Sequence, residues 1–206
     1  MNVTITTGFP ENQRHVAAAL YYDAFRGKLG RLFDPPAKAH RFFASILDPR
    51  FAISALDEQG NLLGIAGYKT ADGALTGGTL TDLSRVYGPV GAIWRAALAS
   101  LLERDLEPGA LLMDGICVRK NARGLGLGTR LLSEIKSTAR DLGCASVHLD
   151  VIDSNPRAAA LYAREGFKAE GTETLGPLRH LFGFSTSTRM VYAVAQHDKL
   201  RRNAAN

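Results

Sequence analysis

The sequence Arg123-Gly124-Leu125-Gly126-Leu127-Gly128-Thr129 lies between a stretch with strand character and a stretch with helical periodicity. Closely spaced glycines allow the backbone to curl until successive N–H groups point at one anion. A helix that begins there adds its unpaired amides and the positive end of its dipole. Arg123, with Arg119 and Lys120 close by, supplies full positive charges that pair with phosphate. The stretch therefore predicts a phosphate-binding loop.

Other glycine-rich nucleotide loops differ from this one in their spacing. A P-loop needs Gly-Lys-Ser/Thr, whereas this sequence has Gly128-Thr129-Arg130. A Rossmann fingerprint needs a third glycine at the position that Thr129 occupies, and a kinase glycine loop needs the same spacing. The loop alone leaves open the alternative of a tight glycine turn beside a solvated basic helix face.

The charge of the chain is concentrated around the same loop. The 206 residues carry 25 Lys+Arg and 20 Asp+Glu, a net charge of +5. Residues 119–140 hold six basic side chains and one acidic side chain, so this segment alone carries a net +5. A charge so localised, without interleaved aromatic residues, indicates a compact anion site and speaks against a broad nucleic-acid-binding surface.

The elements around the loop alternate between strand and helix. On its C-terminal side the pattern predicts a helix over 126–142, a strand over 146–152, a helix from Asn155-Pro156 to Arg164, and strands from Phe167 and near 186–194. On its N-terminal side it predicts strands over 3–7, 51–56, 62–68 and 111–118, helices over 11–25 and from Pro89, an irregular stretch over 26–50 and a loop over 69–82. This order favours a mixed sheet in a single domain, 1–206, with a frayed tail at 197–206.

Two motifs in this region resemble those of the GNAT superfamily of acyl-CoA-dependent N-acyltransferases. The loop matches Arg/Gln-x-x-Gly-x-Gly/Ala as Arg123-x-x-Gly126-x-Gly128, and the second hallmark appears over residues 155–167, Asn-Pro-Arg-Ala-Ala-Ala-Leu-Tyr-Ala-Arg-Glu-Gly-Phe. The resemblance covers 111–167. It implies an α+β fold with a central, mostly antiparallel, twisted sheet of about six to seven strands flanked by helices.

The resemblance also implies where acetyl-CoA, the acyl donor, would bind. The strand that ends at Val118 and the strand 146–152 would splay apart and admit the pantetheine arm. The amide of Val118 would polarise the thioester carbonyl, and Asn155 would hydrogen-bond the arm. The expected contacts with the arm are backbone groups of Ile116, Cys117 and Val118. The expected contacts with the pyrophosphate are amides of Gly124, Leu125, Gly126, Leu127, Gly128 and Thr129, beside Arg123.

Two side chains are candidates for the chemistry of acetyl transfer to an amine. Tyr162 is the candidate acid, because a phenol stays protonated at neutral pH and can donate to the departing thiolate. Asp114 is the candidate base, because it stands four residues before Val118 and strand alternation would place both on one face. Asp150 and a water relay remain alternatives for the base.

Residues outside the motifs bear on the acceptor. The segment 69–110 exceeds the usual spacing of such proteins, and we expect it to shape an acceptor pocket. Eight aromatic residues could form the wall of that pocket: Tyr21, Tyr22, Phe25, Phe33, Phe42, Phe43, Tyr87 and Trp94. Cys117 is expected to be a small core residue, and the histidines show no metal-ligand spacing, so no metal site is expected.

These patterns predict an N-acetyltransferase that uses acetyl-CoA and acts on a primary amine of a small molecule or peptide. The alternatives are a catalytically silent acyl-CoA-binding domain and a nucleic-acid-binding module. No apolar run approaches the ~20 residues of a membrane span, and two cysteines are too few for a disulfide framework. We therefore expect a reduced, cytoplasmic protein without a membrane partner. The family resemblance leaves a homodimer open.

Overall fold

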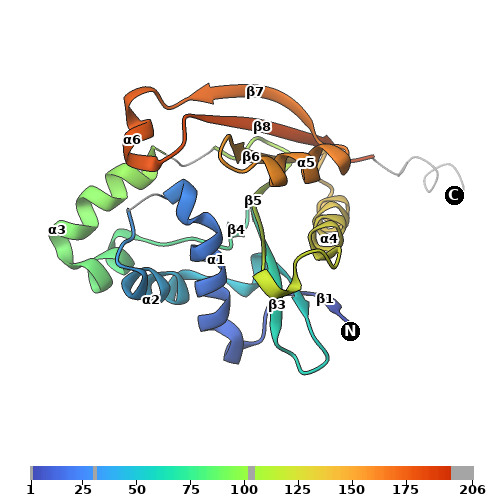
Figure 1. Ribbon diagram of the computed structural model, residues 1–206, viewed down its shortest axis with the longest axis horizontal. Helices are drawn as coiled ribbons and strands as arrows, with labels where there is room; N and C mark the ends of the chain where they lie inside the picture. The colour runs from blue at the N-terminus through green and yellow to red at the C-terminus, as the bar shows by residue number, and fades with distance from the viewer. Residues whose placement is uncertain (1, 30–31, 102–104, 196–206) are drawn as a thin grey trace, which may run out of the picture.

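The computed structural model describes residues 2–29, 32–101 and 105–195 (Figure 1). The strands are β1 (Thr4–Thr7), β2 (Ala52–Leu56), β3 (Leu62–Thr70), β4 (Gly73–Ala74), β5 (Ala110–Val118), β6 (Ser146–Ile152), β7 (Lys168–Thr174) and β8 (Thr186–Ala193). The α-helices are α1 (Arg14–Leu29), α2 (Pro36–Ile46), α3 (Leu80–Ser100), α4 (Leu127–Asp141), α5 (Pro156–Arg164) and α6 (Arg179–Phe182). The predicted tail, 197–206, lies outside the described residues.

One mixed sheet organises these elements. Its strand order is β1-β2-β3-β5-β6-β8-β7, with β4 paired to β3. β5 and β6 run parallel, and the other recorded pairs are antiparallel. The expected mixed, mostly antiparallel sheet is confirmed, and the two-residue β4 brings its strands to eight.

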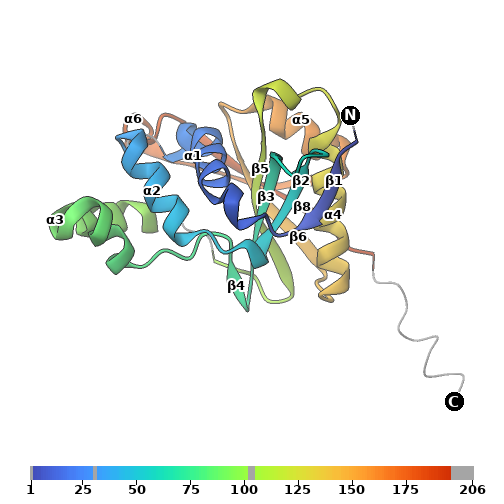
Figure 2. The same cartoon turned by 90° about the horizontal axis from the view of Figure 1, so that it is seen from below.

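Helices cover both faces of this sheet. Figures 1 and 2 show α1, α2 and α3 on one side of β3 and β5 and α4 on the other. The apolar stripe that the spacing predicts for α4 is buried through Leu127, Leu131, Ile135 and Ala139, whereas its last member, Leu142, is exposed at the C-cap. On the opposite face, aromatic side chains of α1 and α2 form much of the core. The chain thus has a predominantly aliphatic layer under α4 and an aromatic layer under α1 and α2.

The helix α2 contradicts the irregular stretch expected over 26–50. Pro35 and Pro36 favour a break in the chain, but Pro35 is the N-cap and Pro36 stands in the first turn of α2. A proline there costs no hydrogen bond, because the first-turn amides have no intrahelical partner. Phe42 and Phe43 of this helix are buried in the core.

The helix α3 begins earlier than expected, at Leu80 instead of Pro89. Thr79 and Asp82 form a capping box at its start, which satisfies two of the free amides of the first turn. The backbone kinks at Gly88, whose φ is 73°, so Pro89 begins a second helical segment within α3. The spacing of the apolar residues from Pro89 onward predicts one helical stripe, but four of its members are exposed, namely Val90, Ile93, Trp94 and Leu101.

Candidate active site

The parallel strands β5 and β6 separate at the place that the sequence predicts. Their register pairs Ala110 with Ser146, Leu111 with Val147 and Leu112 with His148. β5 continues to Val118 and β6 to Ile152, but no further pair between them is recorded in the described chain. The expected splay is therefore confirmed, and it opens beyond Leu112 and His148.

The glycine loop follows β5 after one turn of 3-10 helix (Lys120–Ala122) and leads into α4. Gly124 and Gly126 have φ values of 84° and 73°, the left-handed region that glycine adopts without strain. Gly126 is the N-cap of α4 and has no side chain to cap it, so the amides of the first turn are left to bind an external acceptor. The loop has the geometry of an anion site at a helix N-terminus.

Arg123 has a structural contact within the loop. Its Nε donates a hydrogen bond to the carbonyl of Val118 over 3.2 Å, which ties the loop to the last residue of β5. The side chain is otherwise exposed. Arg123 therefore fixes the end of β5 and carries its charge at the mouth of the splay.

Tyr162 points from α5 toward the same part of β5. Its side chain is 5% exposed, and its ring packs on Phe167 with centroids 5.9 Å apart. Burial is the main cause that raises the pKa of Tyr162 well above its ordinary value, and Cys117 adds to the shift, while a hydrogen bond with the backbone of Ile116 lowers it. The phenol is thus held protonated beside the backbone of β5.

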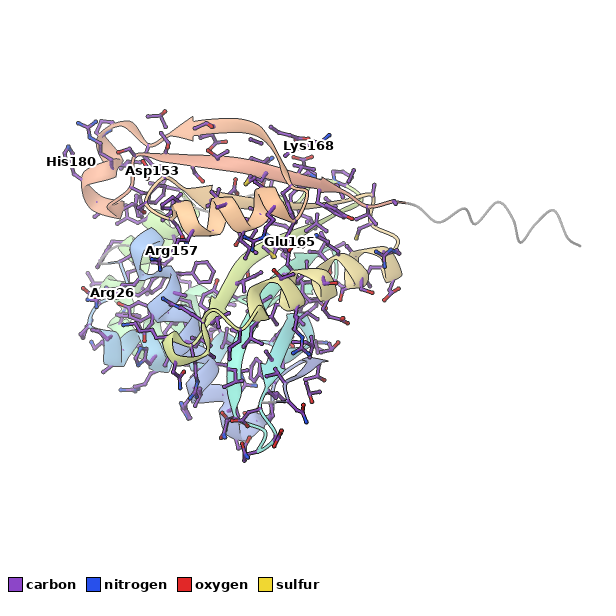
Figure 3. The ribbon with its side chains drawn as sticks, turned by 45° about the vertical axis from the view of Figure 1, so that its right-hand side comes forward. Arg26, Asp153, Arg157, Glu165, Lys168 and His180 are labelled. Carbon is purple, nitrogen blue, oxygen red and sulfur yellow. The ribbon has the colours of Figure 1, made fainter. Side chains whose placement is uncertain are left out.

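Asn155 holds the start of the helix that carries Tyr162. Its Oδ1 accepts a hydrogen bond from the amide of Ala158 over 3.3 Å, so Asn155 is the N-cap of α5, as its sequence position predicts. Figure 3 shows α5 between Arg157, in its first turn, and Glu165, at its end. Leu161 of α5 lies against Gly128 of the loop: a Cβ added to Gly128 would stand 3.1 Å from Cδ2 of Leu161. The two motifs therefore meet in space.

Asp114 lies on the opposite face of the sheet from Val118, contrary to the prediction. The register between β3 and β5 shifts so that Gly67 pairs with Gly115 and Tyr68 with Met113, which leaves Asp114 as the extra residue of a β-bulge. A Cβ on Gly67 would stand 3.1 Å from Asp114 Oδ2, so Asp114 lies on the face of Gly67. The bulge breaks the alternation that the prediction assumed.

The two faces of β5 are identified by what packs on their glycines. Gly115 pairs with Gly67, so the two glycines share a face. A Cβ on Gly115 would stand 2.7 Å from Phe25 of α1, so the face that Asp114 shares with Gly67 is the face of α1 and α2. Val118 pairs with Gly64, whose added Cβ would contact Leu131 of α4. Asp114 is therefore not on the side of Val118, but it faces a cavity under α1 and α2.

That cavity has a volume of about 410 Å³. Asp114 of β5 and Asp150 of β6 both border it, together with Lys69 of β3. Asp150 Oδ1 is 3.9 Å from Nε of Arg189. The two candidate bases thus reach one cavity from the two strands that separate.

Aromatic side chains form much of the remaining wall. Five of the eight expected aromatic residues border the cavity, namely Tyr21, Phe25, Phe33, Phe42 and Phe43, whereas Tyr22, Tyr87 and Trp94 do not. The segment 69–110 also contributes to the wall, through residues of β4, the following loop and α3. The expectation that this segment lines a pocket is confirmed.

Cys117 is a buried core residue, as expected. It is 1% exposed, and burial raises the pKa of its thiol well above the ordinary value, with a smaller contribution from Asp114. A thiol held protonated in this way is a poor nucleophile. Any contact of Cys117 with a bound arm would therefore involve its backbone.

Comparison with known proteins identifies the family. A model of the acetyltransferase (GNAT) family matches residues 17–167. The chain belongs to the GNAT family. Bovine thialysine N-epsilon-acetyltransferase is 34% identical to this GNAT protein over 65 residues, 30% of this chain and 38% of the relative. An uncharacterized N-acetyltransferase of Mycobacterium bovis is 37% identical over 73 residues, 35% of this chain and 43% of the relative. The matches therefore span less than half of these curated relatives.

Solved structures support the same fold over nearly the whole chain. A GCN5-related N-acetyltransferase from Kribbella flavida has a TM-score of 0.62 at 14% identity, covering 93% of this chain and 97% of that one. A phosphinothricin acetyltransferase from Sinorhizobium meliloti, in complex with AcCoA, has a TM-score of 0.58 at 15% identity, covering 97% and 92%. At such identities the similarity concerns the GNAT fold alone.

The described residues contain neither a metal-binding cluster nor a membrane-spanning helix. No group of three or more His, Cys, Asp or Glu side chains there is arranged to hold a metal ion. Within the same residues, no helix combines the length and the apolar character that crossing a bilayer requires.

Proposed function

We propose that this GNAT protein transfers the acetyl group of acetyl-CoA to a primary amine of a small-molecule or peptide acceptor, by direct attack in a ternary complex. The observation that carries the proposal is the separation of β5 from β6 beyond Leu112 and His148, with the glycine loop at one end and Tyr162 beside it. The acetyltransferase names of the relatives and the AcCoA complex of a protein with this fold support it.

The pantetheine arm of acetyl-CoA would lie in the opening between the two strands. Backbone groups of Ile116, Cys117 and Val118 would pair with the arm as a further strand would, because among the described residues β5 has no pair with β6 beyond Leu112. The side-chain nitrogen Nδ2 of Asn155 would bind the arm, while the side-chain oxygen Oδ1 of the same residue caps α5. The pyrophosphate would accept hydrogen bonds from the amides of residues 124–129 at the start of α4, and Arg123 would supply a positive charge.

The reaction requires a neutral amine, a stabilised oxyanion and a proton for the departing sulfur. Asp114 would take the proton of the acceptor ammonium, directly or through water, with Asp150 as the alternative base. The amine nitrogen then forms a bond with the acetyl carbon while the amide of Val118 stabilises the oxyanion. As the carbon–sulfur bond breaks, the Tyr162 phenol donates its proton to the CoA thiolate. The second proton that the nitrogen must lose to become a neutral amide would return to the Tyr162 phenolate, directly or through water.

We also propose that residues 1–206 form a single domain. One sheet joins strands from Thr4 to Ala193, which supports the proposal.

The test is release of free thiol from acetyl-CoA in the presence of a broad panel of amines. The proposal expects acceptor-dependent thiol release with the acetylated amine as the product. Binding of acetyl-CoA without thiol release for any amine would support a silent acyl-CoA-binding domain instead. Absence of both binding and release would contradict the assignment of the site.

A further inference from the structure

The cavity under α1 and α2 has two ends of different chemistry. At the sheet it is bordered by the carboxylates of Asp114 and Asp150, with Lys69 as the one cation on its described lining. Toward the helices it is bordered by phenylalanine rings of α1, of α2 and of the segment between them. A ligand that fills the whole cavity must therefore be polar at one end and apolar at the other.

The apolar end is already formed without a ligand. Phe33 stacks on Phe42, with centroids 5.3 Å apart and planes 11° apart, and on Phe43 edge to face at 5.2 Å. All three rings are buried at 5% exposure or less. Rings that hold each other in place lose little freedom when a ligand arrives, so their apolar surface favours binding at low entropic cost.

The polar end lies where the cofactor would present its acetyl group. Asp114 and Asp150 stand two residues beyond Leu112 and His148, the last recorded pair of β5 and β6. In the reaction proposed above, an acceptor ammonium must reach this point. Carboxylates stabilise an ammonium there and disfavour a second anion.

We propose that the acceptor is a hydrophobic primary amine, whose ammonium lies at Asp114 and Asp150 and whose aromatic or branched aliphatic body fills the phenylalanine end of the cavity. The proposal rests on the acetyl transfer proposed above and narrows its acceptor. The volume, about 410 Å³, lies within the range of about 300–1,000 Å³ for small-molecule sites.

Other amine classes fit this cavity less well. An amino acid would bring its own carboxylate to an end of the cavity where the two carboxylates outnumber Lys69, the one cation on the described lining, so the excess negative charge disfavours it. An amino sugar would place hydroxyl groups against phenylalanine rings, where they lose their hydrogen bonds to water. A polyamine would place a second ammonium among the same rings, without a described carboxylate there.

The experiment compares kcat/KM for 2-phenylethylamine, ethylamine, phenylalanine and spermidine with acetyl-CoA. The expected preference for 2-phenylethylamine over ethylamine is about 10- to 100-fold, because burial of the ring contributes only when the ring is present. Phenylalanine, with the same ring and an added carboxylate, is expected to react at least tenfold more slowly than 2-phenylethylamine. Equal or faster acetylation of ethylamine, phenylalanine or spermidine would overturn the inference while leaving acetyl transfer established.

A matched pair of variants tests the location of the ring. Phe33→Leu is expected to reduce the preference for 2-phenylethylamine over ethylamine several-fold. Phe51→Leu makes the same change at a buried phenylalanine that does not border the cavity, and it is expected to leave the preference unchanged. An equal effect of both variants would overturn the assigned position of the ring.

An assay in which no amine causes release of thiol from acetyl-CoA separates the proposed transfer from the proposed amine site. If acetyl-CoA binds but no thiol is released, the proposed transfer is wrong, and calorimetry with 2-phenylethylamine and ethylamine then tests the cavity by itself. Tighter binding of 2-phenylethylamine that weakens in Phe33→Leu would support a site for hydrophobic amines. Equal or undetectable binding of the two amines would overturn it.

Discussion

Asp114 and Asp150 extend from two parallel strands that are last paired two residues earlier, at Leu112 and His148, and both carboxylates border one cavity. The β-bulge at Asp114 produces this arrangement, because it turns that residue toward the side of α1 and α2. The opening for the acyl donor and the candidate base thus arise within one stretch of β5, residues 113–118.

Replacement of Tyr162 by phenylalanine removes the proposed proton donor and leaves the ring. We expect kcat to fall by about 100-fold or more, the low end of general acid catalysis, with the Kd of acetyl-CoA changed less than twofold. Steady-state kinetics and calorimetry measure the two effects. Tyr192→Phe is the control, because Tyr192 also packs on Phe167 but has no proposed part in the reaction, so this variant should keep full activity. An unchanged kcat in Tyr162→Phe would remove Tyr162 from the mechanism.

Replacement of Asp114 by asparagine keeps the size of the side chain and removes its basicity. We expect kcat/KM at neutral pH to fall about 100-fold and the acidic limb of the pH–rate profile to disappear. Asp150→Asn is the matched variant on the neighbouring strand and should retain that limb. The reverse result would assign the base to Asp150, and a limb retained in both variants would favour a water relay.

Replacement of Gly126 by alanine tests the loop geometry. Gly126 has φ 73° with open space around it, so the substitution strains the backbone without a clash. Gly60, with φ 80° and open space in the β2–β3 turn, is a matched control. We expect both variants to lose about 1 kcal/mol in the free energy of unfolding, and only Gly126→Ala to raise the Kd of acetyl-CoA, by about tenfold. Equal Kd values would argue that the loop does not hold the phosphates.

Replacement of Tyr22 by phenylalanine tests the support of the aromatic wall. Tyr22 donates a hydrogen bond from its hydroxyl to Asp34 Oδ1 over 2.8 Å, next to Phe33. We expect Tyr22→Phe to lower the free energy of unfolding by about 1 kcal/mol at neutral pH, as urea unfolding would measure. Full stability of the variant would contradict a role for this hydrogen bond.

Tyr22 also makes the free energy of unfolding depend on pH in the alkaline range. Burial, followed by the hydrogen bond to Asp34, raises the pKa of Tyr22 to about 12. The unfolded chain, with a pKa near 10, loses this proton first, so the contribution of Tyr22 is complete below pH 10 and declines between about pH 10 and 12. The stability of the wild type should therefore fall more steeply over this range than that of Tyr22→Phe. Parallel curves for the two proteins would contradict the shift.

The sequence alone could predict the elements that local patterns determine. The loop, α4, β6 and the start of α5 depend on glycine spacing, helical periodicity and the Asn155-Pro156 cap, and the structure has all of them. Helix α2 was missed because Pro35-Pro36 is compatible with a break and with a helix start, and only packing of Phe42 and Phe43 into the core decides between them.

The position of Asp114 could not be predicted for a different reason. A β-bulge depends on the register of β5 against β3, and strand alternation carries no information about a residue inserted between two partners. The five aromatic residues of the cavity come from three segments whose meeting is decided by tertiary packing. Their residue type indicated an acceptor wall, but their spacing could not separate Tyr21 or Phe33 from Tyr22 or Tyr87.

Hydrogen exchange with and without acetyl-CoA tests the central claim most directly. The account predicts that acetyl-CoA slows amide exchange in residues 116–118 and 124–129, because the arm pairs with the open side of β5 and the pyrophosphate binds the loop. The strands β1 and β2, at the far edge of the sheet, serve as the internal reference and should exchange unchanged. Binding of acetyl-CoA that leaves exchange in both segments unaltered would contradict the account.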